Sequence, residues 1–229
     1  ELKEDRKIYW NKFPIAILAK GADYLSPELN LIIDDIVEND EKLKLHSFLK
    51  KWVDTKITDE LDSLFKLKNI NSVNSQIRAL SYQLYENNGV VKRDEVLNIV
   101  NSLSQDERKT LRNLGVKFGR YHIFLFKLFK PSVVSLRILL WKNFKGEDLN
   151  LFPPTFGLNF VNDLKYRNKK FMLLCGFEKF DSFFVRIDIL ERLFLMIFNS
   201  KNENNDTEIK LIPDMLNLLG CNKENFIKL

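Results

Sequence analysis

The chain has 229 residues, of which 45% are hydrophobic and 29% charged, and a formal net charge of +5. This length and composition are typical of one large or two small globular domains and exclude a disordered chain. No segment approaches the ~18 uninterrupted apolar residues of a membrane span. Cys175 and Cys221 lie far apart and form no metal-ligand spacing with the two histidines. We therefore expect no metal and no disulfide, two buried cysteines, and a reducing, cytoplasmic compartment.

The positive charge is concentrated in one interval of the chain. No acidic residue occurs between Glu107 and Glu147, and this acid-free interval (residues 108–146) holds ten basic ones. Against a total of +5, the rest of the chain therefore carries −5. A compositional bias toward Lys raises the basic charge anywhere, but it does not remove acids from a single interval. The basic residues of this interval indicate a surface that meets a polyanion, while its apolar and aromatic residues are equally typical of a buried strand that leads into a helix.

The first third of the chain is predicted to form short strands and then a long helix. Apolar runs of strand length cover residues 7–10, 14–19 and 29–33. From 43 to 67 the apolar residues recur at helical spacing. The tetrad DELD at 59–62 has the form of the magnesium-binding motif of helicase motors. Because that motif belongs at the end of a buried strand, we interpret it here as an accidental match.

Three more helices are predicted before residue 116. Ser72 or Asn74 begins the first, and the second spans 90–103. Ser104 begins the third, and Glu107 stands three residues further on, which is the pattern of a capping box.

A strand over 116–126 is predicted next, and Pro131 is placed in the first turn of a helix that Gly146 ends. The loop around Pro153 and Pro154 is the best internal boundary. Beyond it we expect, in order, a helix over 164–176, a strand over 183–187, a helix over 188–198, a polar loop over 200–208 and two short helices over 213–220 and 222–229.

The expected fold class is α+β: mainly α with small β elements. It combines a helical bundle, a short N-terminal β element and a helix-turn-helix or winged-helix-like C-terminal part. We divide the chain into a small β element at 1–36, a helical domain with the basic strand-helix segment at 37–146, and a C-terminal helical subdomain at 147–229.

Four stretches resemble, in the same order, a region beyond the motor domains of bacterial superfamily 2 RNA helicases related to the mitochondrial degradosome helicase. They are WNKFPIAILAKG, LRNLGVKFGRYHIFLFKLFKPSVVSLRILLW, VRIDILERL and PDMLNLLGCNKENFIKL. The resemblance extends from about Trp10 to Leu229. It departs from the family at Phe126, where we expect a proline, and at the end, where relatives continue. We interpret the chain as a fragment of a longer protein.

The resemblance implies an accessory region of an ATP-dependent RNA helicase. The motor, with its ATP and Mg²⁺ sites, would lie upstream in the same protein, so the fragment itself would have no catalytic, cofactor or metal site. The implied partners are RNA, mainly single-stranded, the motor domains and a nuclease.

Phosphate contacts from Lys and Arg, with bases stacked on aromatic side chains, would supply the binding. In a strand, Phe118, Arg120, His122 and Phe124 would share one face, and Gly119 would allow close approach of a backbone or a phosphate. The candidate nucleic-acid-binding residues are Arg108, Lys109, Arg112, Lys117, Phe118, Arg120, Tyr121, His122, Lys127, Lys130, Arg137, Lys142 and Lys145.

Two other functions stay open from the sequence. The acidic remainder of the chain and its amphipathic helices could dock a nuclease or a ribosomal partner. Trp52 and Trp141 would be candidate contacts if exposed, although both fit buried helical faces. An aromatic-basic segment could also bind a membrane surface, although the helix after Pro131 is apolar on too many sides for a clean amphipath.

Overall fold

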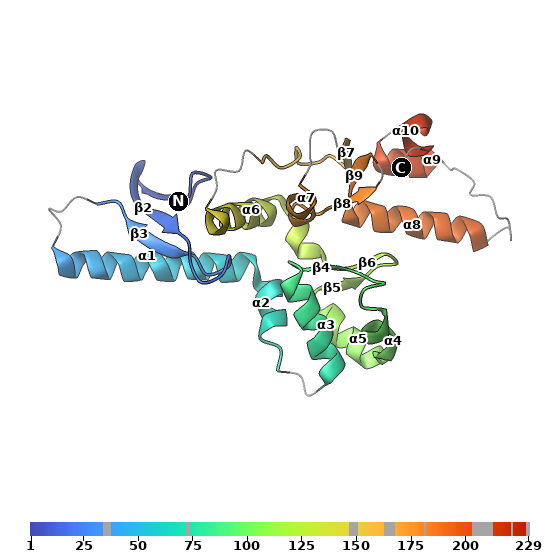
Figure 1. The fold of residues 1–229 in the computed structure, drawn as a ribbon, viewed down its shortest axis with the longest axis horizontal. Coiled ribbons are helices and arrows are strands. Elements are labelled where there is room, and N and C mark those ends of the chain that lie inside the picture. Colours follow the sequence, from blue (N-terminus) through green and yellow to red (C-terminus); the bar gives the residue numbers. More distant parts are fainter. Residues whose placement is uncertain are drawn as a thin grey trace. The chain divides into compact units, whose positions relative to one another are not determined.

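The chain forms a mixed α+β structure, as predicted, in which helices are combined with small antiparallel sheets (Figure 1). The contacts within this computed structural model divide it into two compact units. Unit 1 comprises residues 1–62 and 132–151, and unit 2 comprises residues 63–131 and 152–229. The structure describes residues 1–33, 38–71, 74–146, 151–162, 168–180, 182–202, 213–220 and 222–227.

Unit 1 packs a sheet of three strands against helices. The strands β1 (Lys7–Trp10), β2 (Phe13–Ala19) and β3 (Glu28–Leu31) pair antiparallel in the order β1-β2-β3. Helix α1 (Asn39–Glu60) lies along β3, and helix α6 (Pro131–Lys145) is tied to the end of β2. The tie is a hydrogen bond of 2.8 Å that the Asn143 side chain donates to the carbonyl oxygen of Ala19.

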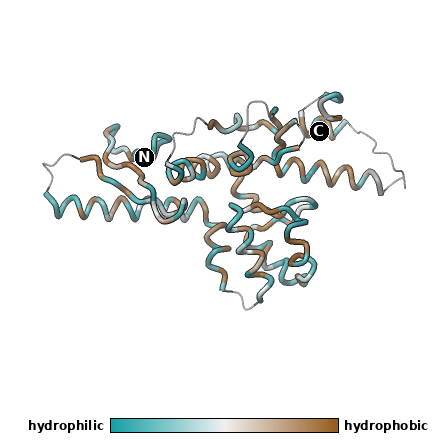
Figure 2. The backbone as a smooth tube through the Cα atoms, in the orientation of Figure 1, coloured by the Kyte–Doolittle hydropathy of each residue, from teal (hydrophilic) through white to brown (hydrophobic). Residues whose placement is uncertain are grey.

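Helix α1 follows the predicted amphipathic pattern, but it is shorter than expected. Leu49, Val53 and Ile57 recur every four residues and are buried. In Figure 2 the helix is mainly teal with brown at intervals, which reflects this single apolar stripe. The helical pattern breaks at Leu61, and a separate helix α2 (Asp62–Lys68) follows. The tetrad at 59–62 therefore lies at a junction of two helices and not at the end of a strand.

The first part of unit 2 packs helices on one face of a second sheet. The strand order is β4-β6-β5, antiparallel throughout, and Figure 1 shows α3, α4 and α5 together on one side of these strands. The elements are α3 (Ser75–Glu86), β4 (Val90–Lys92), α4 (Leu97–Ser102), α5 (Gln105–Asn113), β5 (Val116–Phe118) and β6 (His122–Leu125).

The structure corrects two predictions in this part of the chain. The segment 90–103 is not one helix, because its β-branched start pairs with β6 as strand β4 and only its end is helical. The segment 116–126 is not one strand but a hairpin, since the chain turns at 119–122 and β5 pairs with β6. A 3₁₀ turn, η1 (Phe126–Phe129), then leads to Pro131.

Local capping confirms two of the predicted helix starts. Asn74 accepts hydrogen bonds from the backbone N–H groups of Gln76 and Ile77 at the start of α3. At the start of α5, Ser104 and Glu107 exchange the two reciprocal bonds of a capping box. Pro131 begins α6, also as predicted.

The second part of unit 2 repeats the strand order of the first. Its sheet has the order β7-β9-β8, again antiparallel, and each hairpin is preceded by a helix that ends in a glycine with positive φ, Gly115 or Gly176. The elements are β7 (Phe160–Asn162), α7 (Lys169–Leu174), β8 (Phe177–Phe180), β9 (Phe183–Arg186), α8 (Ile187–Asn202), α9 (Pro213–Leu219) and α10 (Lys223–Ile227).

Helix α8 carries the core of this second part. Leu190 and Leu193 on α8 pack with Met215 and Leu219 on α9, and α8 is mainly brown in Figure 2. The strand predicted over 183–187 and the helix predicted over 188–198 are confirmed. The helix predicted over 164–176 is described only from Asn168, where α7 is capped, and the polar loop predicted over 200–208 falls mostly outside the described residues, although α8 extends to Asn202.

The prediction that both cysteines are buried can be compared with the structure only for Cys175. Cys175, at the end of α7, is buried as expected, and Cys221 lies outside the described residues. Among the residues described, none of the helices has both the length and the apolar character needed to cross a bilayer.

The capping box of α5 gives a test of the fold. We expect Ser104→Ala to lower the free energy of unfolding by about 1 kcal/mol, because the N–H of Glu107 loses its side-chain acceptor. Ser104→Asp keeps an acceptor at this position and should stay close to wild type. Urea unfolding followed by circular dichroism measures both, and equal losses in the two variants would contradict the capping role.

Candidate nucleic-acid interface

The thirteen candidate residues fall in both units of the structure. Arg137, Lys142 and Lys145 lie on α6 in unit 1, and the others lie in unit 2. Arg137 is 1% exposed, so it is a core side chain of α6 and not a surface contact. This corrects the sequence-based expectation, and the reason is that α6 buries residues on several of its faces.

The turn of the β5–β6 hairpin (residues 119–122, here the hairpin turn) is closed around a carboxylate. Glu191 on α8 accepts hydrogen bonds from the backbone N–H groups of Arg120, Tyr121 and His122. Three consecutive N–H groups that converge in this way form a nest, which is an anion-binding arrangement of the backbone. In this protein, the anion in the nest is the protein's own side chain.

Gly119 is explained by the same contact. A Cβ atom at this position would lie 2.3 Å from the Glu191 Oε2 atom and 2.7 Å from the carbonyl oxygen of His122. No other residue fits there without moving the carboxylate. The sequence predicted a close approach to Gly119 by a backbone or a phosphate, and in the structure the approaching group is the Glu191 carboxylate.

His122 is buried between two carboxylates. Its side chain is 0% exposed, its Nδ1 atom is 3.2 Å from Glu191 and its Nε2 atom is 3.4 Å from Glu178 on β8. Burial opposes the charged imidazole, but the hydrogen bonds with Glu178 and Glu191 outweigh it and raise the pKa of His122 above its ordinary value. His122 thus joins the hairpin to β8 and α8, and its burial removes it from the set of direct RNA contacts.

Opposing effects act on the pKa of the Glu178 carboxyl group. Burial raises the pKa of its carboxyl group, but the hydrogen bond with His122 and the charge of Lys92 outweigh this and lower the pKa below its usual value. The Lys92 Nζ atom lies 3.3 Å from Glu178. Lys92, Glu178, His122 and Glu191 therefore form a chain of alternating charge in which each carboxylate has a partner within the protein.

Helix α5 carries two exposed cations and a third, Arg108, whose side chain is hydrogen-bonded within the protein. The Arg108 guanidinium donates to the carbonyl oxygens of Val100 and Leu103 and so caps the end of α4. Lys109 and Arg112 are exposed. The Arg112 guanidinium lies 5.7 Å from the ring centre of Phe118, which brings α5 and the hairpin into one surface.

A groove of about 650 Å³ runs between the hairpin and one face of α8. Its two carboxylates have internal partners, since Asp188 forms a bidentate pair with Arg186 and Glu191 is held by the hairpin turn. We call this feature the hairpin groove. It is lined by Lys117, Phe118, Gly119, Arg120, Phe124, Phe126, Asp188, Glu191, Arg192 and Leu195.

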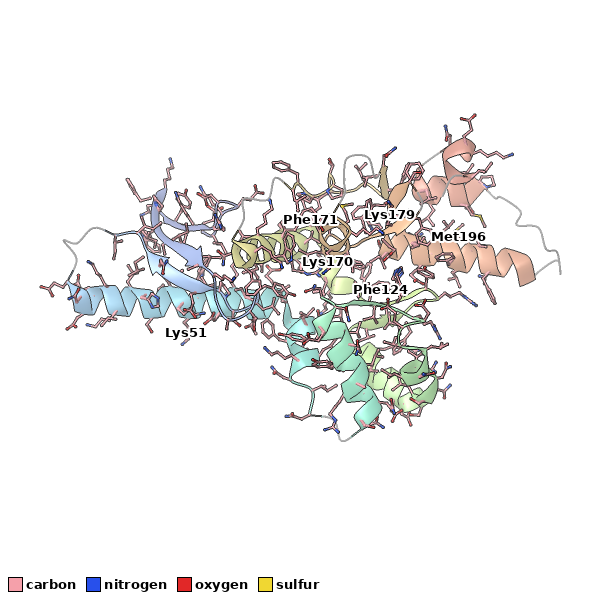
Figure 3. All side chains as sticks on the ribbon, viewed as in Figure 1. Lys51, Phe124, Lys170, Phe171, Lys179 and Met196 are labelled. Carbon is pink, nitrogen blue, oxygen red and sulfur yellow. The ribbon has the colours of Figure 1, made fainter. Side chains whose placement is uncertain are left out.

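The aromatic residues of the hairpin divide between core and surface. Phe124, labelled in Figure 3, is buried with Val90 and Ile187. Tyr121 packs among Phe180 and Phe194, with ring centres 5.7 and 5.4 Å away. Phe118 is half-buried, so of the predicted stacking face only its edge and the Arg120 side chain reach the surface.

Lys127 and Lys130 are exposed on the segment that follows the hairpin. Neither side chain lines the hairpin groove. The structure places Arg112 over Phe118 and brings Lys117, Phe118 and Arg120 into the lining of one groove, while Lys109 lies three residues before Arg112 on α5.

Sequence reasoning missed the contribution of α8 to this surface. Glu191, Arg192 and Leu195 line the groove, and Phe198 lies under the Arg120 guanidinium at 3.2 Å from its ring centre. About 70 residues separate α8 from the hairpin turn, and no periodic pattern connects segments so far apart. The only signal was that VRIDILERL appeared among the segments of the family resemblance.

No family model matches this sequence, and no curated protein or solved structure matches it either. In the part of the chain that the structure describes, no group of three His, Cys, Asp or Glu side chains is placed to hold a metal ion.

Glu191 gives the first test of this site. We expect Glu191→Gln to lower the free energy of unfolding by about 2–3 kcal/mol, because three N–H groups and His122 lose a charged acceptor in a nearly buried position. Glu86→Gln, at an exposed position of α3, is the matched control and should have little effect. Urea unfolding measures both, and equal small changes would contradict a structural role for the nest.

The buried histidine gives a test with pH. A raised pKa means that His122 contributes stability that is fully present below the unfolded value of 6.5 and is lost as the pH rises through the folded pKa. We expect wild type to lose stability relative to His122→Gln as the pH rises from about 6 to 9. The slope of unfolding free energy against pH is the readout. Parallel curves for the two proteins would show that His122 is not held in its charged form.

Proposed function

We propose that unit 2 contacts single-stranded RNA, as an accessory region of an ATP-dependent RNA helicase whose motor lies elsewhere in the longer protein. The observation that carries this proposal is the set of exposed cations on α5, the hairpin and α8, beside a groove whose two carboxylates, Asp188 and Glu191, are bound internally. ATP and Mg²⁺ belong to the motor in this proposal, and unit 2 has a binding role without catalytic chemistry of its own.

The order of elements from α3 to β6 supports a nucleic-acid-binding role. It runs helix, strand, helix, helix, strand, strand, with the sheet order β4-β6-β5. This order resembles that of a winged helix, in which the helix before the hairpin would contact nucleic acid and the hairpin would be the wing. We propose that residues 75–125 form such a module; the winged-helix-like character expected for the C-terminal segment 147–229 stays a prediction.

The positions of the cations agree with that role. Lys109 and Arg112 are exposed on α5, which corresponds to the contacting helix, and Lys117 and Arg120 are exposed on the hairpin. Lys and Arg at a phosphate backbone displace condensed counterions, which gives affinity without sequence preference and makes it depend on salt. The internal partners of Asp188 and Glu191 reduce the repulsion that these acids would exert on a phosphate.

A docking function is the second candidate, and a specific feature of unit 1 favours it. Trp10 and Phe13 stand opposite each other at the tip of the β1–β2 hairpin and are 67% and 74% exposed. Large exposed aromatics of this kind are enriched at the centres of protein interfaces. The tryptophans named from the sequence, Trp52 and Trp141, are half-buried on α1 and α6. Unit 1 could thus hold a nuclease or another protein while unit 2 contacts RNA.

Salt dependence tests the RNA function. We expect the chain to bind a short single-stranded oligouridylate with an affinity that falls steeply between about 50 and 200 mM salt. Neutralising two phosphate contacts in Lys109→Gln/Arg112→Gln should reduce the slope of log affinity against log salt by about 1.4, since each contact on a single strand contributes about 0.7. Fluorescence anisotropy of a labelled oligomer measures the slope.

The matched control is Lys169→Gln/Lys170→Gln, which removes the same charge from exposed positions on α7. It should keep the wild-type slope. If both double variants bind like wild type, or if wild type shows no salt-dependent binding, the RNA function is wrong and the docking function becomes the better one.

A further inference from the structure

We propose that the hairpin groove holds one unpaired nucleotide of the RNA, with its base on an apolar floor and its phosphates at a basic rim. This inference rests on the proposed RNA function and deepens it. It assigns base stacking to Phe126 and Leu195, which no sequence pattern had marked for this purpose, and it adds Arg192 to the phosphate contacts.

Two large apolar side chains of the groove lining, Phe126 and Leu195, are open to solvent, and we call them the floor of the groove. Phe126 is 48% exposed and Leu195 is 51% exposed, although both are large hydrophobic side chains. They come from η1 and α8, with the groove between them. The volume of about 650 Å³ lies within the range of sites that hold one small ligand. A planar base can cover these side chains and remove their apolar surface from water.

The rim of the groove is positive. Lys117 and Arg120 stand on the hairpin and Arg192 on α8, and all three side chains are exposed. The two carboxylates of the groove do not oppose this charge fully, because one is paired with Arg186 and the other is bound by the hairpin turn. An apolar floor with a cationic rim complements a nucleotide, which has a flat base and an anionic backbone, better than it complements a neutral or acidic peptide side chain.

The groove is also held in shape before any ligand binds. The Glu191 carboxylate fixes the backbone of the hairpin turn to α8, which sets the distance between the two walls. The Arg120 guanidinium lies over the ring of Phe198 and is thereby positioned at the rim. Groups that are already ordered lose little entropy on binding, so more of the contact energy appears as affinity.

The contacts proposed for the groove read no particular base. Stacking on Phe126 and Leu195 uses the flat face that every base has, and contacts to phosphate carry no sequence information. We therefore expect similar affinities for oligouridylate and oligoadenylate, apart from differences in stacking strength.

Two probes separate base stacking from phosphate contact. One is a labelled single-stranded oligouridylate, and the other is an abasic ribose-phosphate oligomer of the same length. Phe126→Ala should weaken oligouridylate binding about 5-fold to 100-fold and leave the abasic oligomer unchanged, because only the base is lost from the floor. Arg192→Gln should weaken binding of both oligomers by similar factors. Phe156→Ala, at another exposed phenylalanine of unit 2 outside the groove, should alter neither.

The outcomes distinguish this inference from the function on which it rests. If wild type binds the two oligomers equally, or if Phe126→Ala weakens both or neither, the nucleotide site is wrong while the RNA function stands. If wild type binds neither oligomer in a salt-dependent way, the RNA function itself is wrong. Thermal unfolding shows whether Phe126→Ala is folded; if it is not, Leu195→Ala is used in its place and must give the same selective loss for uridylate.

Discussion

The carboxylate of Glu191 accepts hydrogen bonds from three consecutive backbone N–H groups of the hairpin turn, across about 70 residues of chain. The buried His122 extends this contact to Glu178, and Glu178 extends it to Lys92. Because the turn, β4, β8 and α8 meet at these groups, the two sheets of unit 2 are joined by charge as well as by apolar packing. This contact, together with the packing of Phe124 on Ile187, holds α8 beside the hairpin and so forms the hairpin groove.

The charged residues near the hairpin fall into two groups, those with partners inside the protein and those exposed to solvent. Three acids near the hairpin have partners inside the protein: Glu191 accepts from the N–H groups of the turn, Glu178 contacts His122, and Asp188 pairs with Arg186. Arg108 is used in the same structural way, at the end of α4. The exposed cations of α5, the hairpin and α8 are then left facing solvent. The RNA-binding role proposed for unit 2 follows from this division and not from the net charge of the whole chain.

The two sheets of unit 2 share one strand order, but their hairpins make different contacts. The turn of the β5–β6 hairpin is bound by Glu191 of α8, whereas β8 of the second hairpin supplies Glu178, which contacts His122. The first sheet also has helices α4 and α5 between its first and second strands, while the second has α7 in that place among the described residues. In the proposed RNA contact, the first half would supply α5 and the β5–β6 hairpin, and the second half supplies Glu191 and Glu178, which hold the hairpin.

The sequence by itself determined the features that depend on neighbouring residues. The capping box of Ser104 and Glu107 and the start of α6 at Pro131 involve groups no more than four residues apart, so their patterns are complete within a short segment. For α3 the sequence left Ser72 and Asn74 as alternatives, and the structure shows the cap at Asn74. The acid-free interval is likewise evident from the sequence, because it depends only on which residues occur between 108 and 146. Tertiary structure alone decided that β4 is a strand, that His122 and Arg137 are buried, and that Glu191 closes the hairpin turn. Each of these depends on partners supplied by distant segments, whose identity no local periodicity encodes.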